Sequence, residues 1–464
     1  MYKTPSQHYL RLHFPRSRFS RRLEDMLLIL ASRIVSLGAT SKDQFDSTLD
    51  TIIRETLAQP LAAKSIKNQR TEMVRLFGLV KYSEGLALPG NRLSILSQTQ
   101  DIPRFFKSFC MRFQFPGGFV KPDRVSEMVA AGVHFKPAQY ILTLLKNGES
   151  RFGNDFAISA AEMAHFVFND KRVTVSNEST NNVLTRIVDN RTSGGGIDKT
   201  SDVIRYARDF LNYMVEGNLL DELKGMYRLN GGEQRAIHSI IADKSFFGGY
   251  SKVIKSDGKW DVEEYKQVDQ AWMEYFADAQ DDEALETPVS ALIKTNANLP
   301  DEWERIREML KHKNTSAKRA ILKELGDEGE RIAFDYERGE VAKARKDLLH
   351  LVKVVSSNGT LGYDILSLQP EQNRRKKFIE VKTTKKNYES DVVIPFFMSI
   401  NEWSAAEQLG DDYYIYRVII TREKVTIFSI KNPVLQYKNG HLRIEATAYK
   451  IVYSTEAGTS INIK

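Results

Sequence analysis

The 464-residue sequence contains one cysteine, Cys110, and no run of 18 consecutive apolar residues. One cysteine excludes an intrachain disulfide and a multi-cysteine zinc site, and it is typical of a protein from a reducing compartment. The absence of a long apolar run predicts no transmembrane helix, and the first residues lack the apolar segment of a secretory signal. We therefore expect a cytoplasmic protein without membrane contact.

Two further absences concern cofactors. The eight histidines show neither an HExxH pair nor another metal-ligand spacing. The segment GGGIDKT (194–200) superficially resembles a phosphate-binding loop, but Asp198 stands where that loop needs a glycine, and no apolar strand precedes it. We therefore expect no bound nucleotide and interpret this segment as a linker.

Charge is moderately unbalanced, with 67 Lys and Arg residues against 60 Asp and Glu residues and a net charge of +7. A basic excess favours a polyanionic partner but does not require one. With 42% hydrophobic residues, the chain can form packed cores, and its length predicts two to four domains.

The N-terminal half contains one pattern twice. In Lys67–Leu96 a helix ending near Gly78 precedes two short apolar strands around a Ser-Glu-Gly turn, and Val203–Ile237 repeats this order. A helix followed by a β-wing is how a winged helix-turn-helix ends. We therefore predict two helical, winged-helix-like regions, at 1–115 and 116–245.

In such a module the second helix enters the major groove and its polar face contacts base edges. The candidate DNA-binding residues of the two helices are Lys67, Gln69, Arg70, Arg75, Arg205 and Arg208. The alternative is that these are ordinary helix-surface residues and that the wings make protein contacts.

The composition changes around Asp278–Pro300, which is acidic and then rich in Ala and Asn. Residues 246–304 are interpreted as a linker and helical connector, and residues 305–464 as helices followed by strands, one of which is VVIPFFMS (392–399). This order predicts a C-terminal α/β domain with a mixed sheet, of ordinary domain size. The predicted fold class is therefore multidomain α+β.

A predicted hairpin in this domain carries unusual charges, in GYDILSL (362–368) and KFIEVKTTKK (377–386). Period-two alternation places Asp364 across from Glu380, with Lys382 on the same face. Clustered carboxylates are costly in a half-buried sheet, and Mg²⁺ would remove that cost by binding their oxygens. Lys382 could then hold the attacking water or help to deprotonate it.

The sequence around the hairpin strengthens this interpretation over a plain surface hairpin with a polar face. A preceding helix carries Glu330, which could supply a third carboxylate to the metal. The flanking basic residues suit a phosphate backbone, and the candidates are Arg374, Arg375, Lys376, Lys377, Lys385 and Lys386.

The pattern Asp…Glu-x-Lys after a Glu-bearing helix resembles the PD-(D/E)XK nuclease superfamily, the fold of many restriction endonucleases. It is similar in more detail to the domain named after the C-terminus of plant NO VEIN proteins. The motifs that carry this resemblance are Gly362–Ile365, Ile379–Thr384, Pro395–Phe397, Asn401–Trp403 and Tyr416–Val418. The resemblance covers about residues 320–425. It implies a metal-dependent nuclease-like fold with Glu330, Asp364, Glu380 and Lys382 in the catalytic positions.

The N-terminal part resembles the target-recognition regions of type II restriction enzymes. Together the two resemblances imply a magnesium-dependent endonuclease that cuts specific sequences in double-stranded DNA, with two chains on the DNA. A competing interpretation is a DNA-binding component of a bacterial defence complex whose nuclease-like domain is inactive or needs a partner. The same residues would also suit an enzyme that cuts RNA or single strands, or a partner of a separate ATPase.

Overall fold

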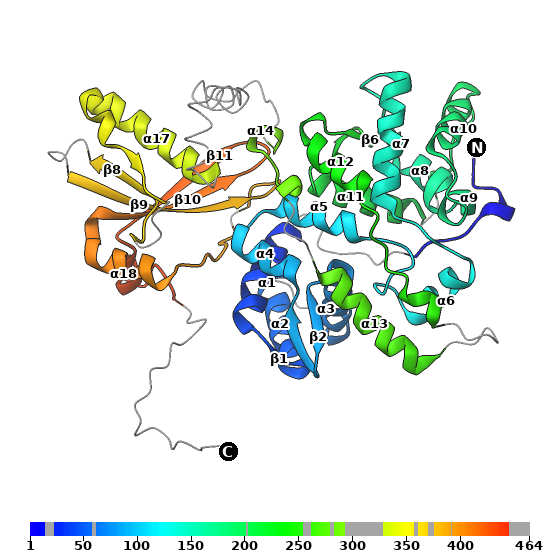
Figure 1. Ribbon diagram of the computed structural model, residues 1–464, viewed down its shortest axis with the longest axis horizontal. Coiled ribbons are helices and arrows are strands. Elements are labelled where there is room, and N and C mark those ends of the chain that lie inside the picture. Colours follow the sequence, from blue (N-terminus) through cyan, green and yellow to red (C-terminus); the bar gives the residue numbers. More distant parts are fainter. Residues whose placement is uncertain are drawn as a thin grey trace, which may run out of the picture.

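The computed structural model describes residues 1–13, 23–57, 62–200, 203–253, 261–278, 283–292, 328–356, 361–369, 375–390 and 392–444. A mostly helical N-terminal region lies beside a C-terminal domain built on a mixed sheet (Figure 1). The predicted multidomain α+β class is confirmed at this level. Among the described residues, no helix is long and apolar enough to cross a membrane.

The N-terminal region contains fourteen α-helices in its described part. They are α1 (Leu23–Leu37), α2 (Lys42–Leu57), α3 (Ala63–Phe77), α4 (Asn91–Thr99), α5 (Ile102–Arg112), α6 (Pro122–Ala130), α7 (Pro137–Phe152), α8 (Ala160–Met163), α9 (Lys171–Thr174), α10 (Thr180–Thr192), α11 (Val203–Glu216), α12 (Gln234–Ala242), α13 (Val262–Ala277) and α14 (Val289–Leu292).

The predicted repeat is present as two helix–hairpin units, with helices of 15 and 14 residues and hairpins of the same size. Helix α3 precedes β2 (Val80–Ser83) and β3 (Leu86–Pro89), and α11 precedes β5 (Leu220–Leu223) and β6 (Met226–Leu229). Both hairpins pair four residues with four across a two-residue turn. Both turn residues have positive φ in each copy, which fits the right-handed twist of a hairpin. A two-residue strand, β1 (Thr40–Ser41) or β4 (Ile158–Ser159), adds a third strand to each hairpin.

One aromatic core joins the two units. The Tyr213 ring on α11 stacks on Phe106 of α5 at 5.7 Å between centroids and meets Phe77 of α3 edge-on at 5.5 Å. Phe109 also contacts all three rings. This core crosses the predicted boundary at 115/116, so the two units are packed as one body.

The C-terminal domain has a five-stranded sheet in the order β11-β10-β9-β8-β7. The strands are β7 (Lys353–Val354), β8 (Ile365–Gln369), β9 (Arg375–Lys385), β10 (Tyr413–Ile420) and β11 (Val425–Lys431). The β9–β10 pair is parallel and the other pairs are antiparallel, so the predicted mixed sheet is confirmed.

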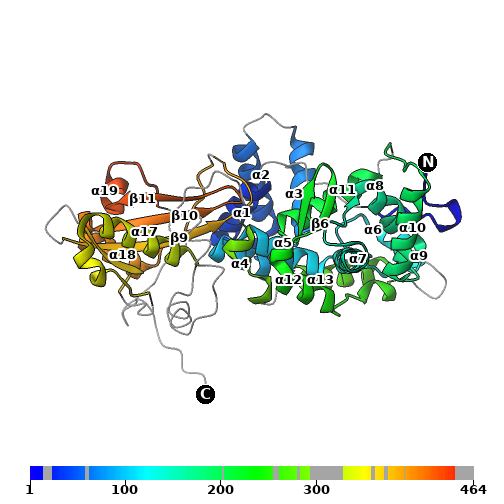
Figure 2. The same ribbon diagram turned by 90° about the horizontal axis from the view of Figure 1, so that it is seen from above.

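Helices cover both faces of this sheet (Figures 1 and 2). On one face α17 (Glu328–Arg345) packs Ile332 and Ala333 against Ile379. On the other face, α18 (Ile400–Leu409) and α19 (Pro433–Lys438) cover Ile415 and its neighbours. Alternation along β9 therefore directs odd-numbered Ile379 and Val381 toward α17, and even-numbered side chains toward α18.

One expected strand is wrong. The segment VVIPFFMS was predicted to be a strand, but residues 392–399 have no regular secondary structure. Pro395 has no N–H for a sheet ladder, and its carbonyl instead accepts a hydrogen bond from Gln100 of the N-terminal region at 2.6 Å.

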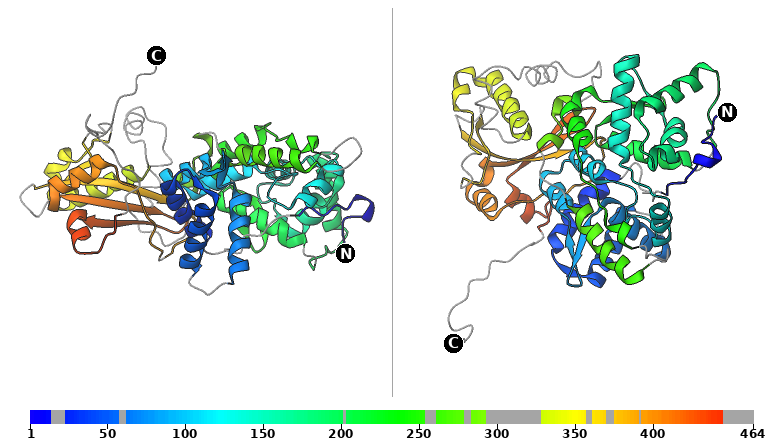
Figure 3. Two further views of the ribbon diagram at one scale, coloured as in Figure 1. Left: turned by 90° about the horizontal axis from the view of Figure 1, so that it is seen from below. Right: turned by 45° about the vertical axis from the view of Figure 1, so that its right-hand side comes forward.

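The two regions meet where β9 ends and the chain passes the ends of α1, α4 and α5 (Figure 3). The backbone N–H of Asn387 donates to Glu24 Oε1 at 2.9 Å, and Lys386 Nζ lies 3.0 Å from Asp25 Oδ1. The junction is therefore polar and directly continuous with the strand that carries Glu380 and Lys382.

Candidate active site

Asp364 and Glu380 lie next to each other on adjacent strands. Ile365 of β8 pairs with Ile379 of β9, which sets Asp364 opposite Glu380. The Asp364 N–H donates to Ile379 O at 2.9 Å, and Asp364 Oδ2 accepts from the Val381 N–H at 2.8 Å. These bonds fix the Asp364 carboxylate at the start of β8, beside Glu380.

Lys382 lies between two carboxylates. Its Nζ is 2.7 Å from Glu380 Oε1 and 2.8 Å from Glu402 Oε2. Glu402 belongs to the first turn of α18 and also accepts a hydrogen bond from the Ser399 N–H, so it closes a capping box at that helix start. Sequence reasoning gave Glu402 no role, although the Ser-x-x-Glu spacing at 399–402 signalled the cap that fixes it.

Burial and an excess of acid together determine the electrostatics of this site. Burial, with the charges of Asp364 and Glu402, raises the pKa of Glu380 to about 8, while Lys382 opposes the shift. Burial alone would lower the pKa of Lys382, but Glu380 and Glu402 outweigh it and the net pKa is raised. Lys382 is therefore an ammonium ion at neutral pH, which argues against the expected role in deprotonating water.

Glu330 belongs to α17, the helix that covers the opposite face of the sheet from α18. It lies in the first turn of α17, which packs on the face formed by Ile379 and Val381. Glu380 and Lys382 point toward the opposite face, where Glu402 of α18 meets the lysine. Within the described ranges, no three Asp, Glu, His or Cys side chains form a group that could hold a metal ion.

The donor set nevertheless fits one hard divalent cation. Asp364 uses Oδ2 for the Val381 N–H, and Glu380 is buried against it with a strongly raised pKa. Mg²⁺ is commonly held by one or two carboxylates, with water and phosphate oxygens as its other ligands. Asp364 and Glu380 are therefore the residues that would hold it.

The predicted basic flank of the hairpin divides into two groups. Arg375 and Lys376 are exposed, and Arg375 pairs with Asp412. Lys377 lies on the α17 side of the sheet, where its Nζ is 2.8 Å from Glu337 Oε1. Arg374 lies outside the described residues.

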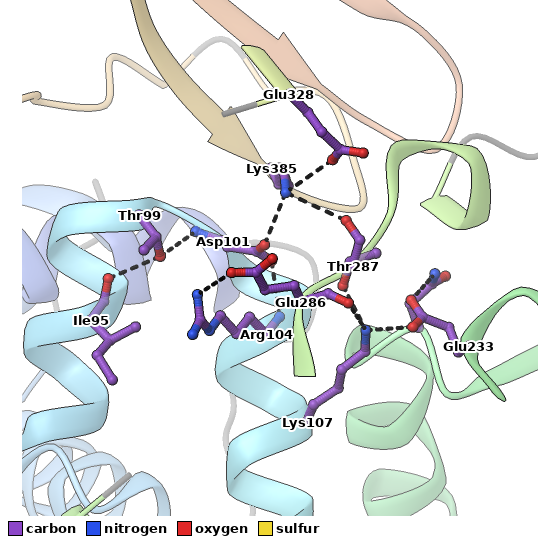
Figure 4. Close-up of polar contacts among 11 residues, drawn as sticks. Ile95, Thr99, Asp101, Arg104, Lys107, Glu233, Glu286, Thr287, Glu328 and Lys385 are labelled. Carbon is purple, nitrogen blue, oxygen red and sulfur yellow. Dashed lines mark hydrogen bonds and ion pairs between the residues drawn. The ribbon is translucent and has the colours of Figure 1, made fainter. Parts of the chain in front are cut away.

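The two lysines after Lys382 belong to the domain junction. Lys385 Nζ lies 3.4 Å from Asp101 Oδ2 and 3.3 Å from Glu328 Oε2 (Figure 4). Lys386 is 3% exposed and paired with Asp25. Their placement argues against the predicted DNA contacts, because carboxylates from distant segments already neutralise both ammonium groups.

The predicted DNA-reading residues also differ between the two units. In α3, Arg70 pairs with Asp46 and Asp50, and Arg75 pairs with Asp269. Both guanidinium groups therefore hold the fold together.

By contrast, Arg205 and Arg208 of α11 are exposed. Lys67 of α3 is also exposed, whereas the Gln69 side chain lies outside the described part of α3. Of the two helices, α11 therefore carries the exposed pair of arginines.

Known proteins match the C-terminal domain and the N-terminal region separately. Residues 329–430 match the family model described as Protein NO VEIN, C-terminal. The chain is 29% identical over 164 residues to Protein NO VEIN of Arabidopsis thaliana, covering 33% of this chain and 6% of that protein. It is 32% identical over 130 residues to Protein NO VEIN-LIKE of the same plant, covering 27% of this chain and 18% of that one. The chain thus spans a small part of these relatives.

A second set of matches covers the N-terminal region. A crystal structure of pyrene- and phenanthrene-modified DNA in complex with the BpuJ1 endonuclease binding domain has a similar fold, with a TM-score of 0.53 and 23% identity. That similarity covers 58% of this chain and 98% of the other. Residues 2–273, more than half of the chain, match the family model described as Restriction endonuclease BpuJI, N terminal. The chain belongs to this family.

Proposed function

We propose that the protein is a metal-dependent DNA endonuclease in which the N-terminal region binds a specific duplex sequence and the C-terminal domain hydrolyses the phosphodiester. The observation that carries the proposal is the cluster of Asp364, Glu380 and Lys382, held by hydrogen bonds in the same chain as a BpuJI-family region. The C-terminal domain would be of PD-(D/E)XK type, and the helix–hairpin units would act as winged-helix readers.

Each residue of the cluster has a role that follows from its charge and contacts. Asp364 and Glu380 would hold Mg²⁺, which when bound supplies positive charge to the scissile phosphate. Lys382, kept as an ammonium by Glu380 and Glu402, would donate a hydrogen bond to a phosphate oxygen or to the attacking water. Glu402 would orient Lys382 from the start of α18.

The proposed duplex partner is supported by the family of the N-terminal region and by the DNA-bound structure that shares its fold. Exposed Arg205 and Arg208 give α11 the cationic face that phosphate contacts require. Because a chain offers one such cluster and a duplex has two strands, we expect two chains to act together on DNA.

The test is incubation of the full chain with mixed plasmid and phage DNA in Mg²⁺ or in EDTA, followed by mapping of the ends. Defined ends in Mg²⁺ alone are the expected result. Intact DNA in Mg²⁺, with binding retained, would contradict the proposal.

That second outcome would favour a DNA-binding defence component whose nuclease-like domain is inactive or requires a partner. The observation behind this alternative is that, in the part of the chain the structure describes, no three Asp, Glu, His or Cys side chains form a group that could hold a metal ion.

A further inference from the structure

Gln100 of the N-terminal region lies against the end of the strand that carries Lys382. It follows α4 directly, is 5% exposed, and has a left-handed backbone with φ of 48°. Its carbonyl accepts a hydrogen bond from the Lys385 N–H at 2.8 Å, and the next residue, Asp101, forms a parallel bridge with Lys385. The N-terminal region therefore pairs with the last residue of β9, three residues after Lys382.

The Gln100 side chain makes three further contacts, all with the C-terminal domain. Its Oε1 accepts from Arg417 Nη2 at 3.0 Å and from the Thr384 hydroxyl, and its Nε2 donates to Pro395 O at 2.6 Å. Both the oxygen and the nitrogen of this side chain are thus used across the junction.

Arg417 connects Gln100 to Lys382. Its Nη1 donates to the Lys382 carbonyl at 3.0 Å and its Nη2 to Thr384 Oγ1 at 2.9 Å, while the guanidinium lies 4.7 Å from the centre of the Phe396 ring. Arg417 is 6% exposed, and burial lowers its pKa to about 10. Its contacts within the described residues include no carboxylate, so neutral oxygens hold this buried cation in place.

The α4–α5 corner that presents Gln100 is itself firmly held (Figure 4). Asp101 caps α5 by accepting from the Arg104 N–H at 2.9 Å. Lys385 Nζ donates to Thr287 O at 3.4 Å, and Lys107 Nζ donates to Thr287 Oγ1 at 2.8 Å. These bonds fix the corner against both β9 and the segment before α14.

We infer that Gln100 is a positioning residue for the nuclease site, acting through Arg417 on the backbone of Lys382. The inference rests on the proposed function. The Lys382 ammonium meets Glu380 and Glu402 at 2.7 and 2.8 Å, and the position of its backbone determines how well it reaches both carboxylates. The N-terminal region then contributes to the geometry of the cutting site as well as to binding.

The test compares three variants of the full chain. Gln100→Met keeps the side-chain length but removes the amide donor and acceptor. Gln100→Glu keeps the acceptor for Arg417, and Glu24→Gln alters the same junction without touching Arg417. The readouts are the single-turnover cleavage rate at saturating DNA, the Kd for DNA in EDTA, and the melting temperature.

We expect Gln100→Met to slow cleavage by about 10- to 100-fold at unchanged Kd, the range that a misplacement of 1 Å or less produces. Gln100→Glu should recover most of the rate, and Glu24→Gln should cleave like the native chain. The inference is overturned if Gln100→Met cleaves at the native rate, or if Glu24→Gln loses the same activity.

A separate measurement does not depend on cleavage. In protein with ¹³C-methylated lysines, the Lys382 resonance is identified by its loss in Lys382→Arg. Gln100→Met should displace this resonance in metal-free protein, whereas Glu24→Gln should not. If the native chain does not cleave, this result still supports the positioning role while the proposed function fails, and an unmoved resonance in Gln100→Met overturns the inference.

Discussion

The N-terminal region and the C-terminal domain bury charge in different ways. In the N-terminal region, two lysines are each matched by one carboxylate: Lys107 Nζ lies 2.6 Å from Glu233 Oε2 with both side chains at most 1% exposed, and Lys136 pairs with Asp243. In the C-terminal domain, Lys382 contacts Glu380 and Glu402, and Asp364 adds a third carboxylate beside Glu380.

The difference distinguishes charges that hold the fold together from charges that need a proton or a bound cation. A matched buried pair holds its two segments together, and breaking it leaves an uncompensated ion. An acidic cluster with one ammonium instead favours protonation or the arrival of a cation, and the raised pKa of Glu380 expresses this. Perturbed carboxyl groups of this kind are typical of functional sites.

The largest expected effect concerns the acidic cluster of the C-terminal domain. Asp364→Asn should slow Mg²⁺-dependent cleavage by roughly 10³-fold or more, because it removes one of two ligand carboxylates. The same change should lower the pKa of Glu380 from about 8, since Asp364 contributes to raising it. Cleavage rates and NMR titration of the Glu380 carboxyl measure the two effects, and unchanged cleavage would refute the assignment of Asp364.

The next effect concerns the matched pair. Lys107→Met should destabilise the fold by about 3–5 kcal/mol, because Glu233 would remain buried without its partner. Denaturant unfolding measures this cost. Lys266→Met on α13 is the control, because its pair with Glu263 is largely exposed and should contribute little. If the two substitutions lowered the free energy of unfolding equally, burial of the ion pair would not explain its contribution to stability.

A smaller effect separates the two helix–hairpin units. Replacing Arg205 and Arg208 by Ala should make the slope of log K for DNA binding against log salt concentration less steep by about 2, one for each lost phosphate contact. Replacing Arg70 and Arg75 should instead lower the melting temperature, since both pair with carboxylates of the fold. Fluorescence anisotropy across a salt series checks this, and the reverse ranking would move the DNA-binding face to α3.

The smallest effect lies at the junction between the two regions. Burial and the nearby Glu24 raise the pKa of Glu216 well above its usual value. Protonated Glu216 therefore contributes its full stability to the fold at pH values below 4.5, the approximate pKa of this group in the unfolded chain. This stability is lost as the pH rises through the pKa of Glu216 in the folded protein. Glu216→Gln should raise the melting temperature by a few degrees at pH 8 and leave it nearly unchanged at pH 4. A rise of equal size at both values would exclude the titration of Glu216 as the cause.

Local patterns were enough to predict part of this structure. Alternation in β9 predicted that Glu380 and Lys382 share a face, and the Glu84–Gly85 turn predicted the first hairpin. Each depends on residues that are close in the sequence or on directly adjacent strands.

The remaining features depend on distant segments. Nothing in the sequence near Lys385 and Lys386 indicates their partners. These are Asp101 and Asp25, which lie about 280 and 360 residues earlier in the chain. Gln100 and Arg417 are also far apart in the sequence, so no local pattern predicted their contact. Residues 392–399 were predicted as a strand from their apolar side chains, which contact the junction and α18 instead.

The account's central claim is that one chain binds DNA with its N-terminal region and cuts it with the Glu380 cluster. Glu380→Ala and the native chain should therefore be compared side by side, with DNA affinity measured in EDTA and plasmid cleavage measured in Mg²⁺. The account predicts equal affinity and cleavage by the native chain alone. Cleavage by Glu380→Ala at the native rate, or loss of binding together with cleavage, would contradict it.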